Sequence, residues 1–364
     1  MKPFCIRKRR IGVGWPCYII AEAGVNHNGN SDMACGLIDA AEKAGADAVK
    51  FQTFKTEKLV ARGTKMADYQ IANMSSNNDQ FDLLQQLEIG EKGFRKIFRH
   101  AAKIGIEVFS TPDEESSADL LERLGVPVFK IGSAEVTNLP FLKYLATKKK
   151  PIILSSGMSR LSEVALALET LWDAGADQIA LLHCVSAYPA SLDSLNLKVI
   201  PMLASCFGIP VGFSDHTLGD EASLAATALG ASIIEKHLTL DKSLPGPDHI
   251  CSLDPFEFET MVRRIRNVER ALGDGYKEPA GEELSTREVV RKGLVADRDL
   301  KSGAVLARTD IAVKRVGEKA VVPADLEKVI GLTLTKSISS DTPISWEMFK
   351  TVDFPADSLE KRKK

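Results

Sequence analysis

The chain has 364 residues, of which 44% are hydrophobic and 26% are charged, and its formal net charge is −2. This balance is typical of a soluble globular protein and gives no reason to expect nucleic acid or an acidic membrane as a partner. No apolar run reaches the roughly 18 residues of a membrane span, and no apolar segment of signal-peptide length follows the basic run at residues 7–10. The six cysteines lack CxxC spacing, so we expect reduced thiols in a cytoplasmic protein.

A repeated pattern of helix, glycine and apolar strand runs along most of the chain. A glycine stands where a left-handed helix C-terminus is favoured, at Gly45, Gly105, Gly125, Gly175, Gly208 and Gly230. The pattern predicts eight strands, Tyr18–Gly24, Ala48–Phe54, Glu107–Pro112, Val128–Ser133, Pro151–Gly157, Ile179–Ser186, Val211–His216 and Ser232–Leu238. Strands that alternate with helices pair in parallel. Eight units within about 255 residues fit an α/β fold of the (β/α)8 TIM-barrel type, and the first strand is not followed by the GxGxxG of a dinucleotide-binding sheet.

The composition changes after the last predicted helix, which suggests four parts. We expect a catalytic barrel over residues 1–272, a Gly-, Pro- and acid-rich linker over 273–288 and a small β-rich domain over 289–350. That small domain contains two similar stretches, VADRDLKSGAVLARTDI and LTKSISSDTPISWEMF. A charged tail occupies residues 351–364, and its last part, Asp357–Lys364, is predicted to be disordered. A long insert within the barrel, Lys55–Ile89, is typical of a functional loop over a barrel mouth.

Two histidines stand at the ends of the last two predicted strands. Because strand side chains alternate faces, Glu235 and His237 point to one side and Lys236 to the other. If these strands are neighbours, His216 and His237 meet at the C-terminal edge, where barrel enzymes carry their chemistry. The pair then fits either a divalent metal site or two hydrogen-bonded strand ends.

Two lysines interrupt otherwise apolar strands, and an unpaired lysine there would be costly. Lys50 and Lys130 lie near strand ends rich in Ser and Thr, which suits a small substrate that carries phosphate and carboxylate. The alternative is a structural ion pair of either lysine with Glu22 or Glu235.

At this point the residues resemble a known family, the sialic acid (nonulosonate) synthases, which include N-acetylneuraminate, legionaminate and pseudaminate synthases. The resemblance covers nearly the whole chain and rests on IIAEAGVNHNG, GADAVKFQTF, FSTP, VFKIGS, PIILSSGM, LLHCVSAYP, GFSDHTLG, ALGASIIEKHLTLDK and PGPDH. Residues 289–350 resemble the antifreeze-like (SAF) domain that follows the barrel in this family.

The resemblance implies condensation of phosphoenolpyruvate with an open-chain N-acylated hexosamine and release of phosphate. It implies a divalent cation, Mn²⁺ or Mg²⁺, with His216 and His237 as protein ligands and a Lewis-acid role at the aldehyde. Glu22 and Glu235 would be acid/base or positioning groups. Lys50 and Lys130 would bind the carboxylate of phosphoenolpyruvate. The hydroxyls implied to bind its phosphate are those of Thr111, Ser133, Ser155, Ser186 and Ser214.

The resemblance also assigns Gln52, Tyr188 and Asp248 to the sugar and its acyl group. It implies a domain-swapped homodimer in which Arg315 reaches the partner's barrel. Two positions depart from the common pattern: Val316 replaces a frequent proline, and Ser186 is asparagine in some members. No single residue of the Lys55–Ile89 insert is carried over, although Tyr69 and Asn73 are possible substrate contacts.

The sequence motifs favour N-acetylmannosamine as the acceptor, which would give N-acetylneuraminate. The alternatives are a 2,4-diacetamido-2,4,6-trideoxymannose acceptor, which would give N,N'-diacetyllegionaminate, and then a pseudaminate synthase. Two other classes stay open: a metal-dependent barrel aldolase that uses free pyruvate, and a non-catalytic carbohydrate-binding role centred on the SAF domain.

Overall fold

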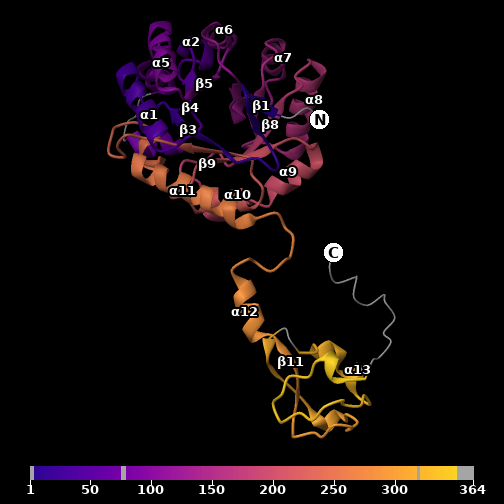
Figure 1. The fold of residues 1–364 in the computed structure, drawn as a ribbon. Helices are drawn as coiled ribbons and strands as arrows, with labels where there is room; N and C mark the ends of the chain where they lie inside the picture. The colour runs from indigo at the N-terminus through magenta and orange to yellow at the C-terminus, as the bar shows by residue number, and fades with distance from the viewer. Residues whose placement is uncertain (1–3, 75–78, 318–319, 351–364) are drawn as a thin grey trace. The chain divides into compact units, whose positions relative to one another are not determined.

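The computed structural model describes residues 4–74, 79–317 and 320–350, so the predicted tail at 351–364 lies outside the described residues. The chain divides between Asp274 and Gly275 into two compact units, drawn in Figure 1. Each unit has its own hydrophobic core.

The first unit is built on eight parallel strands. These are β3 (Tyr18–Gly24), β4 (Ala48–Thr53), β5 (Glu107–Pro112), β6 (Phe129–Ile131), β7 (Ile152–Ser155), β8 (Ile179–Cys184), β9 (Val211–Asp215) and β10 (Ile233–His237). Their order is β5-β4-β3-β10-β9-β8-β7-β6. The outer strands β5 and β6 also lie against each other, so the sheet curls into a nearly closed barrel. The predicted (β/α)8 fold class is confirmed. Strands β9 and β10 are neighbours, which is the condition under which His216 and His237 were expected to meet.

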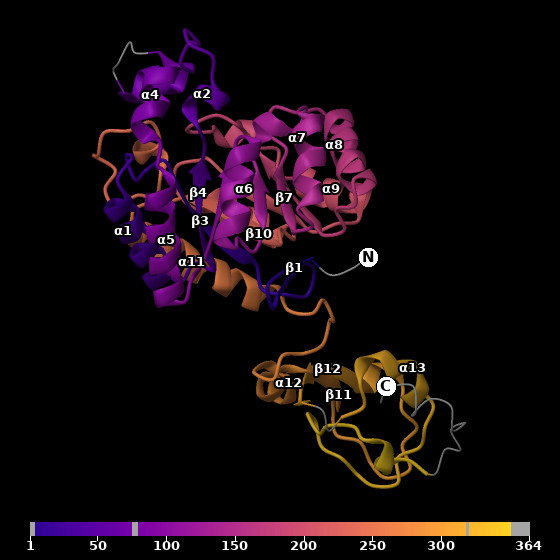
Figure 2. The same ribbon diagram turned by 90° about the horizontal axis from the view of Figure 1, so that it is seen from above.

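Helices surround these strands (Figure 2). They are α1 (Ser31–Lys43), α5 (Glu91–Ile104), α6 (Glu115–Leu124), α7 (Leu139–Thr147), α8 (Leu161–Asp173), α9 (Val199–Phe207), α10 (Glu221–Ala228) and α11 (Pro255–Leu272). The six glycines predicted to follow helices all have positive φ. A residue without a Cβ adopts that conformation at little cost, which allows the chain to turn sharply from helix into strand.

The predicted insert carries α2 (Thr56–Leu59), α3 (Asp68–Met74) and α4 (Gln80–Leu87). Figure 2 shows α2 and α4 beyond the end of β4, at the C-terminal edge of the barrel. These insert helices are packed onto the barrel through a separate apolar cluster, which consists of Val25, Phe54, Met66, Leu83 and Leu87. The hairpin of β1 (Phe4–Ile6) and β2 (Arg9–Ile11) lies at the opposite end of the barrel in the same view.

The second unit begins with α12 (Glu283–Val290), a helix that starts within the stretch predicted as a linker. Strands β11 (Lys292–Ala296) and β12 (Ile311–Arg315) are antiparallel, and α13 (Leu326–Val329) follows. The two similar sequence stretches pair through isolated bridges such as Leu300 with Ile338. Each stretch ends in a 3-10 turn, η4 (Arg308–Asp310) in the first and η7 (Trp346–Met348) in the second.

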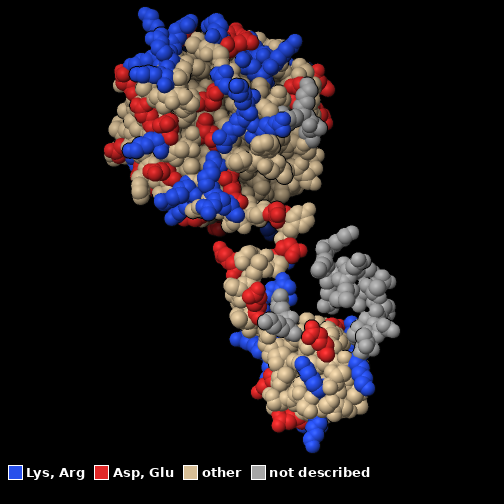
Figure 3. All heavy atoms as spheres, in the orientation of Figure 1, with Lys and Arg blue, Asp and Glu red and all other residues tan. Residues whose placement is uncertain are grey.

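The surface carries charges of both signs. On the face of the barrel unit shown in Figure 3, basic and acidic side chains are interspersed, which agrees with the small net charge. Within the described part of the chain, every helix is too short or too polar to cross a lipid bilayer.

Candidate active site

The predicted site residues of the barrel converge at the C-terminal ends of its strands. Glu22 on β3 lies beside Lys50 on β4, which is its direct neighbour in the strand register. Glu235 on β10 is paired in register with Ser214 on β9. All four side chains are buried inside the barrel. Strand alternation thus turns these polar residues inward, while the residues next to them in sequence face the helices.

The two lysines and two glutamates form one buried charge network. The Lys50 Nζ lies 2.7 Å from Glu22 Oε2 and 3.8 Å from Glu235 Oε1. The Lys130 Nζ lies 3.6 Å from the same Glu235 oxygen. The lysines are thus paired with glutamates, which is the ion-pair alternative that the sequence left open. Glu235 is shared between two cations, however, so the mouth of the barrel carries two ammonium groups around one central carboxylate.

Hydroxyl groups complete this network. Lys50 donates to Thr111 Oγ1 at 3.3 Å, and Lys130 donates to Ser155 Oγ at 2.7 Å. Ser214 Oγ donates to Glu235 Oε1 at 2.9 Å. Three of the five hydroxyls predicted to bind phosphate therefore lie beside the charged groups.

The two glutamates differ in acidity. Burial raises the pKa of Glu22 to about 7, although Lys50 opposes the shift. Burial also disfavours ionisation of Glu235, but Lys130, Lys50 and the Ser214 hydroxyl outweigh it and lower its pKa. Two carboxyl groups whose environments separate their pKa values are suited to different proton-transfer roles.

The two histidines lie close together, as predicted, with ring centroids 5.6 Å apart. Burial lowers the pKa of both imidazoles, to about 4 for His216 and well below its ordinary value for His237. His216 Nδ1 donates to the Val185 carbonyl at 2.7 Å, which leaves Nε2 with its lone pair. His237 Nδ1 is buried without a hydrogen-bond partner. Two neutral imidazoles with lone pairs to offer, one oriented by a backbone carbonyl, have the chemistry of metal ligands.

In the part of the chain that the structure describes, no cluster of three or more His, Cys, Asp or Glu side chains is arranged to hold a metal. A cation at the histidines would therefore have two protein ligands, with its other positions left to water and substrate. Such an open coordination sphere is typical of a catalytic rather than a structural metal site.

Aromatic rings line the space next to the histidines. The Tyr188 ring lies 4.2 Å from the His216 ring and 4.9 Å from the Tyr69 ring, measured between centroids. Asp248 Oδ2 lies 3.9 Å from His237 Nδ1, and burial raises the pKa of Asp248 to about 6. Gln52 donates to Glu22 Oε1 at 3.4 Å. The three residues predicted to contact the sugar thus border the charge network on its histidine and Glu22 sides.

A second group of small polar side chains surrounds Gly157, just beyond β7. Gly157 N donates to Ser133 Oγ at 2.9 Å, and Ser133 Oγ lies 3.1 Å from the Cys184 thiol. A Cβ at Gly157 would lie 2.3 Å from Ser186 Oγ, which is far inside contact distance. The absence of a side chain at Gly157 thus lets Ser133 and Ser186 lie close to the backbone, and we call these three residues the Gly157 cradle.

Tyr69 and Asn73 were named from the sequence as possible substrate contacts, whereas no role was predicted for Asp113. Tyr69 and Asn73 lie on α3 of the insert, and Asn73 Nδ2 donates to the carbonyl of Pro247, next to Asp248. Asp113 follows β5, and burial raises its pKa to about 7, helped by Glu135. The position of Asp113 directly after a strand was the sequence feature that could have identified it as a site residue. Arg315 is an exposed residue at the end of β12 in the second unit.

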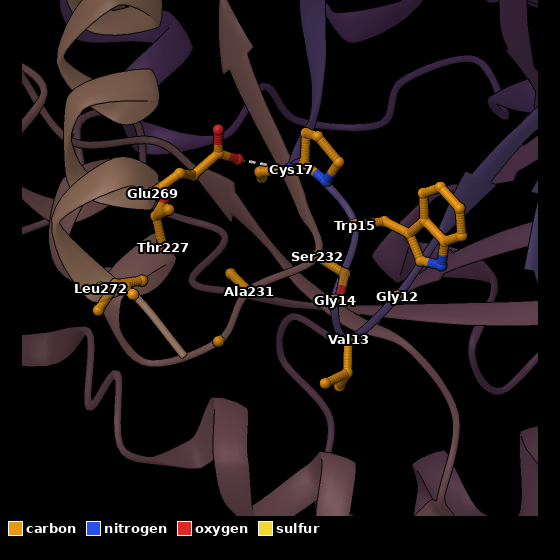
Figure 4. Close-up of a pocket in the computed structure, with 13 residues that line it drawn as sticks. Gly12, Val13, Gly14, Trp15, Cys17, Thr227, Ala231, Ser232, Glu269 and Leu272 are labelled. Atoms are coloured by element: carbon orange, nitrogen blue, oxygen red, sulfur yellow. Dashed lines mark hydrogen bonds between the residues drawn. The ribbon is translucent and has the colours of Figure 1, made fainter. Parts of the chain in front are cut away.

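A hollow of about 400 Å³ lies at the opposite end of the barrel (Figure 4). The loop Gly12–Cys17 lines it together with Ala231, Ser232 and Leu272. The Glu269 carboxylate in this hollow accepts hydrogen bonds from the Cys17 backbone N–H and from Arg266. The carboxylate of this hollow is thus paired within the chain, whereas the two buried lysines and the histidine pair lie at the other end.

An eight-stranded α/β barrel with paired cations, paired carboxyls and paired imidazoles at its C-terminal mouth defines a barrel enzyme that handles a small anionic substrate. Comparison with known proteins narrows this class. The model of the NeuB family matches residues 37–277, and the model of the SAF domain matches residues 291–350. The chain belongs to the NeuB family, which confirms the class predicted from the sequence, a carbon–carbon bond-forming nonulosonic acid synthase followed by a SAF domain.

Individual relatives span nearly the whole chain. The N,N'-diacetyllegionaminic acid synthase of Legionella pneumophila is 44% identical over 92% of this chain and 95% of its own length. The human N-acetylneuraminate-9-phosphate synthase is 34% identical over 93% of this chain and 94% of its own. A crystal structure of the N-acetylneuraminic acid synthetase of Leptospira borgpetersenii, in complex with citrate, superposes with a TM-score of 0.71 at 33% identity. The superposition covers 78% of this chain and 95% of the Leptospira protein chain.

Proposed function

We propose that the protein condenses phosphoenolpyruvate with an open-chain N-acylated hexosamine aldehyde and releases inorganic phosphate. The observation that carries this proposal is the pair of buried lysines around Glu235, with the Gly157 cradle beyond β7. Phosphoenolpyruvate carries a carboxylate and a phosphate on adjacent groups, so it presents two anions to two cationic or hydrogen-bonding regions. The NeuB family membership supports the same assignment.

When phosphoenolpyruvate binds, its carboxylate pairs with Lys50 and Lys130 in place of some of their contacts with Glu22 and Glu235. The hydroxyls of Ser133 and Ser186 donate hydrogen bonds to its phosphate. The C3 carbon of phosphoenolpyruvate then attacks the aldehyde carbon, and the positive charge that builds at C2 is stabilised by the nearby carboxylates. Water adds at C2 and gives one proton to Glu22, which passes it to the alkoxide formed from the aldehyde. The adduct then breaks its C2–O bond to phosphate, the remaining hydroxyl proton at C2 leaves with the phosphate, and a keto acid forms.

His216 and His237 fit a divalent cation, which we propose to be Mn²⁺ or Mg²⁺. When bound, such an ion supplies Lewis-acid polarisation of a carbonyl. Tyr188 and Asp248 border the histidines and are placed to orient the acceptor next to that position. Because the histidine pKa values are lowered, both rings are neutral and ready to bind a cation at neutral pH.

We propose 2,4-diacetamido-2,4,6-trideoxymannose as the preferred acceptor, which differs from the preference for N-acetylmannosamine drawn from the motifs. Two N,N'-diacetyllegionaminic acid synthases are 44% and 43% identical to the chain. The human N-acetylneuraminate-9-phosphate synthase and a pseudaminic acid synthase are each 34% identical. We further propose a homodimer in which Arg315 of one protomer completes the acceptor site of the other.

The test is an acceptor screen with phosphoenolpyruvate and Mn²⁺ in which phosphate release is measured. The acceptors are the diacetamido sugar, N-acetylmannosamine and its 6-phosphate, and free pyruvate replaces phosphoenolpyruvate in a parallel set. We expect the highest kcat/KM with the diacetamido sugar and no product from pyruvate. Product from pyruvate would indicate an aldolase, and failure of all three acceptors would refute the synthase assignment.

A further inference from the structure

A second buried charge pair lies on the outer side of the strands that carry the histidines. Asp215 and Lys236 are cross-strand partners on β9 and β10, and each immediately precedes one of the two histidines. Their side chains point away from the barrel interior and are fully buried, with 0% exposure for each. The Lys236 Nζ lies 3.1 Å from Asp215 Oδ2.

This pair is held by a complete set of hydrogen bonds. Lys236 also donates to the Thr217 carbonyl at 2.6 Å and reaches Thr217 Oγ1 at 3.3 Å. Asp215 Oδ1 accepts from the Thr217 N–H and hydroxyl at 2.9 and 2.8 Å, and Oδ2 accepts from Ser223 Oγ at 2.6 Å. Ser223 belongs to α10, so the network ties both strand ends and the residue after His216 to the covering helix.

A network of this kind is not explained by stability alone. Burying two charges is costly, and apolar side chains of similar size often stabilise a fold as well or better. What the network does fix is geometry, because residues 215–217 and 236–237 are the backbone segments that carry the two imidazoles. Groups behind a metal ligand that hold it in place commonly change metal affinity when they are removed.

We propose that Asp215 and Lys236, with Thr217, are positioning residues that set the spacing and orientation of His216 and His237 for a divalent cation. This inference rests on the proposed metal role of the two histidines. It assigns no contact with substrate to the pair. The network acts from the outside of the sheet, by holding the two strand ends in one register.

The experiment measures Mn²⁺ affinity of the full-length protein, stripped of metal, from the electron paramagnetic resonance signal of free Mn²⁺. The variant Asp215→Asn/Lys236→Met removes both charges together, so no uncompensated charge stays buried. We expect the variant to stay folded by circular dichroism and its Kd for Mn²⁺ to rise by roughly 10–100-fold. An unchanged Kd in the folded variant would overturn the inference.

Two further variants guard against a general loss of stability. Thr217→Val keeps the charge pair but removes the hydroxyl contacts, and it replaces the double variant if that protein fails to fold. We expect Thr217→Val to weaken Mn²⁺ binding. Unchanged Mn²⁺ binding by this variant would overturn the inference. Arg266→Met removes ion pairs to Asp47 and Glu269 at the other end of the barrel and should leave the Kd unchanged. Equal weakening by this control would also overturn it.

Mn²⁺ binding by the wild type and by His237→Ala tests the metal site separately from the positioning role of Asp215 and Lys236. Wild-type protein should bind Mn²⁺, and His237→Ala should lose that binding. If the wild type does not bind, the metal site is refuted and the positioning role falls with it. If the wild type binds and the double variant binds equally well, the positioning role alone is refuted.

Discussion

Glu22 shows how burial and charge together set the chemistry of a single residue. Its carboxyl is 2.7 Å from an ammonium group, yet burial still raises its pKa to about 7. Glu235 lies between two ammonium groups and stays ionised. The same type of side chain is therefore suited to carry a proton in one position and to act as a fixed counter-charge in the other, which are the roles we propose for the two glutamates.

This difference predicts a pH dependence. Glu22 is protonated at low pH and becomes a base as the pH rises through about 7, so kcat/KM should rise over that interval. Glu22→Gln cannot ionise and should lower kcat/KM by roughly 10²–10⁴-fold. The measurement is phosphate release between acidic and mildly alkaline pH for both proteins.

A matched control is available in Asp113, whose pKa burial also raises to about 7. Asp113→Asn should retain the rise of kcat/KM with pH. If the rise persists in Glu22→Gln and is lost in Asp113→Asn, the titrating base is Asp113 and the role given to Glu22 is wrong.

At the scale of elements, the alternation of strand side chains accounts for most of the site. It predicted that Glu235 and His237 share one face of the strand, that Lys236 lies on the other face and that His216 meets His237. The recurrent glycines predicted where helices end. These are local properties of the backbone, so one sequence is enough to derive them.

Features that depend on contacts between distant segments could not be predicted in this way. The approach of Ser133, Ser186 and Gly157 joins the ends of three strands and is visible only from coordinates. The placement of Tyr69 over Tyr188 depends on how the insert folds back on the barrel. The placement of Lys236 on the face opposite to His237 was predictable, but its ion pair with Asp215 and the bond of Asp215 to Ser223 on α10 were not.

The insert helix α3 leads to a second prediction. Because the Tyr69 ring stacks against Tyr188 at 4.9 Å, Tyr69→Ala removes an aromatic pair that contributes about 0.5–1.5 kcal/mol. We expect the KM for the acceptor to rise roughly 2–10-fold while the KM for phosphoenolpyruvate stays the same, as measured by steady-state kinetics. Tyr69→Phe keeps the ring and should behave like wild type. An equal rise in both KM values would contradict an acceptor-side role for α3.

At the scale of the whole molecule, the chain is a barrel unit and a SAF unit with separate cores. The barrel unit supplies the proposed catalytic groups, and Arg315 is the residue of the SAF unit for which we propose a role in the site. A dimer that exchanges SAF units would place each Arg315 in the partner's barrel.

Mixed dimers test this exchange. Neither Glu22→Gln nor Arg315→Ala should be active alone at limiting acceptor. After denaturation and refolding together in equal amounts, half of the sites in each mixed dimer combine an intact barrel with an intact Arg315. Activity should recover to about a quarter of the wild-type value. If mixing restores no activity, Arg315 acts within its own chain, and if Arg315→Ala is fully active alone, Arg315 has no role in the site.

The most direct test of the central claim follows the oxygen atoms of the reaction. With the diacetamido sugar, phosphoenolpyruvate and Mn²⁺ in H₂¹⁸O, water adds at C2 and phosphate leaves with its bridging oxygen. We therefore expect, by ³¹P nuclear magnetic resonance, that the released phosphate contains no ¹⁸O. Phosphate labelled with one ¹⁸O would show that water attacks phosphorus and that the P–O bond breaks, and it would contradict the proposed cleavage at C2–O.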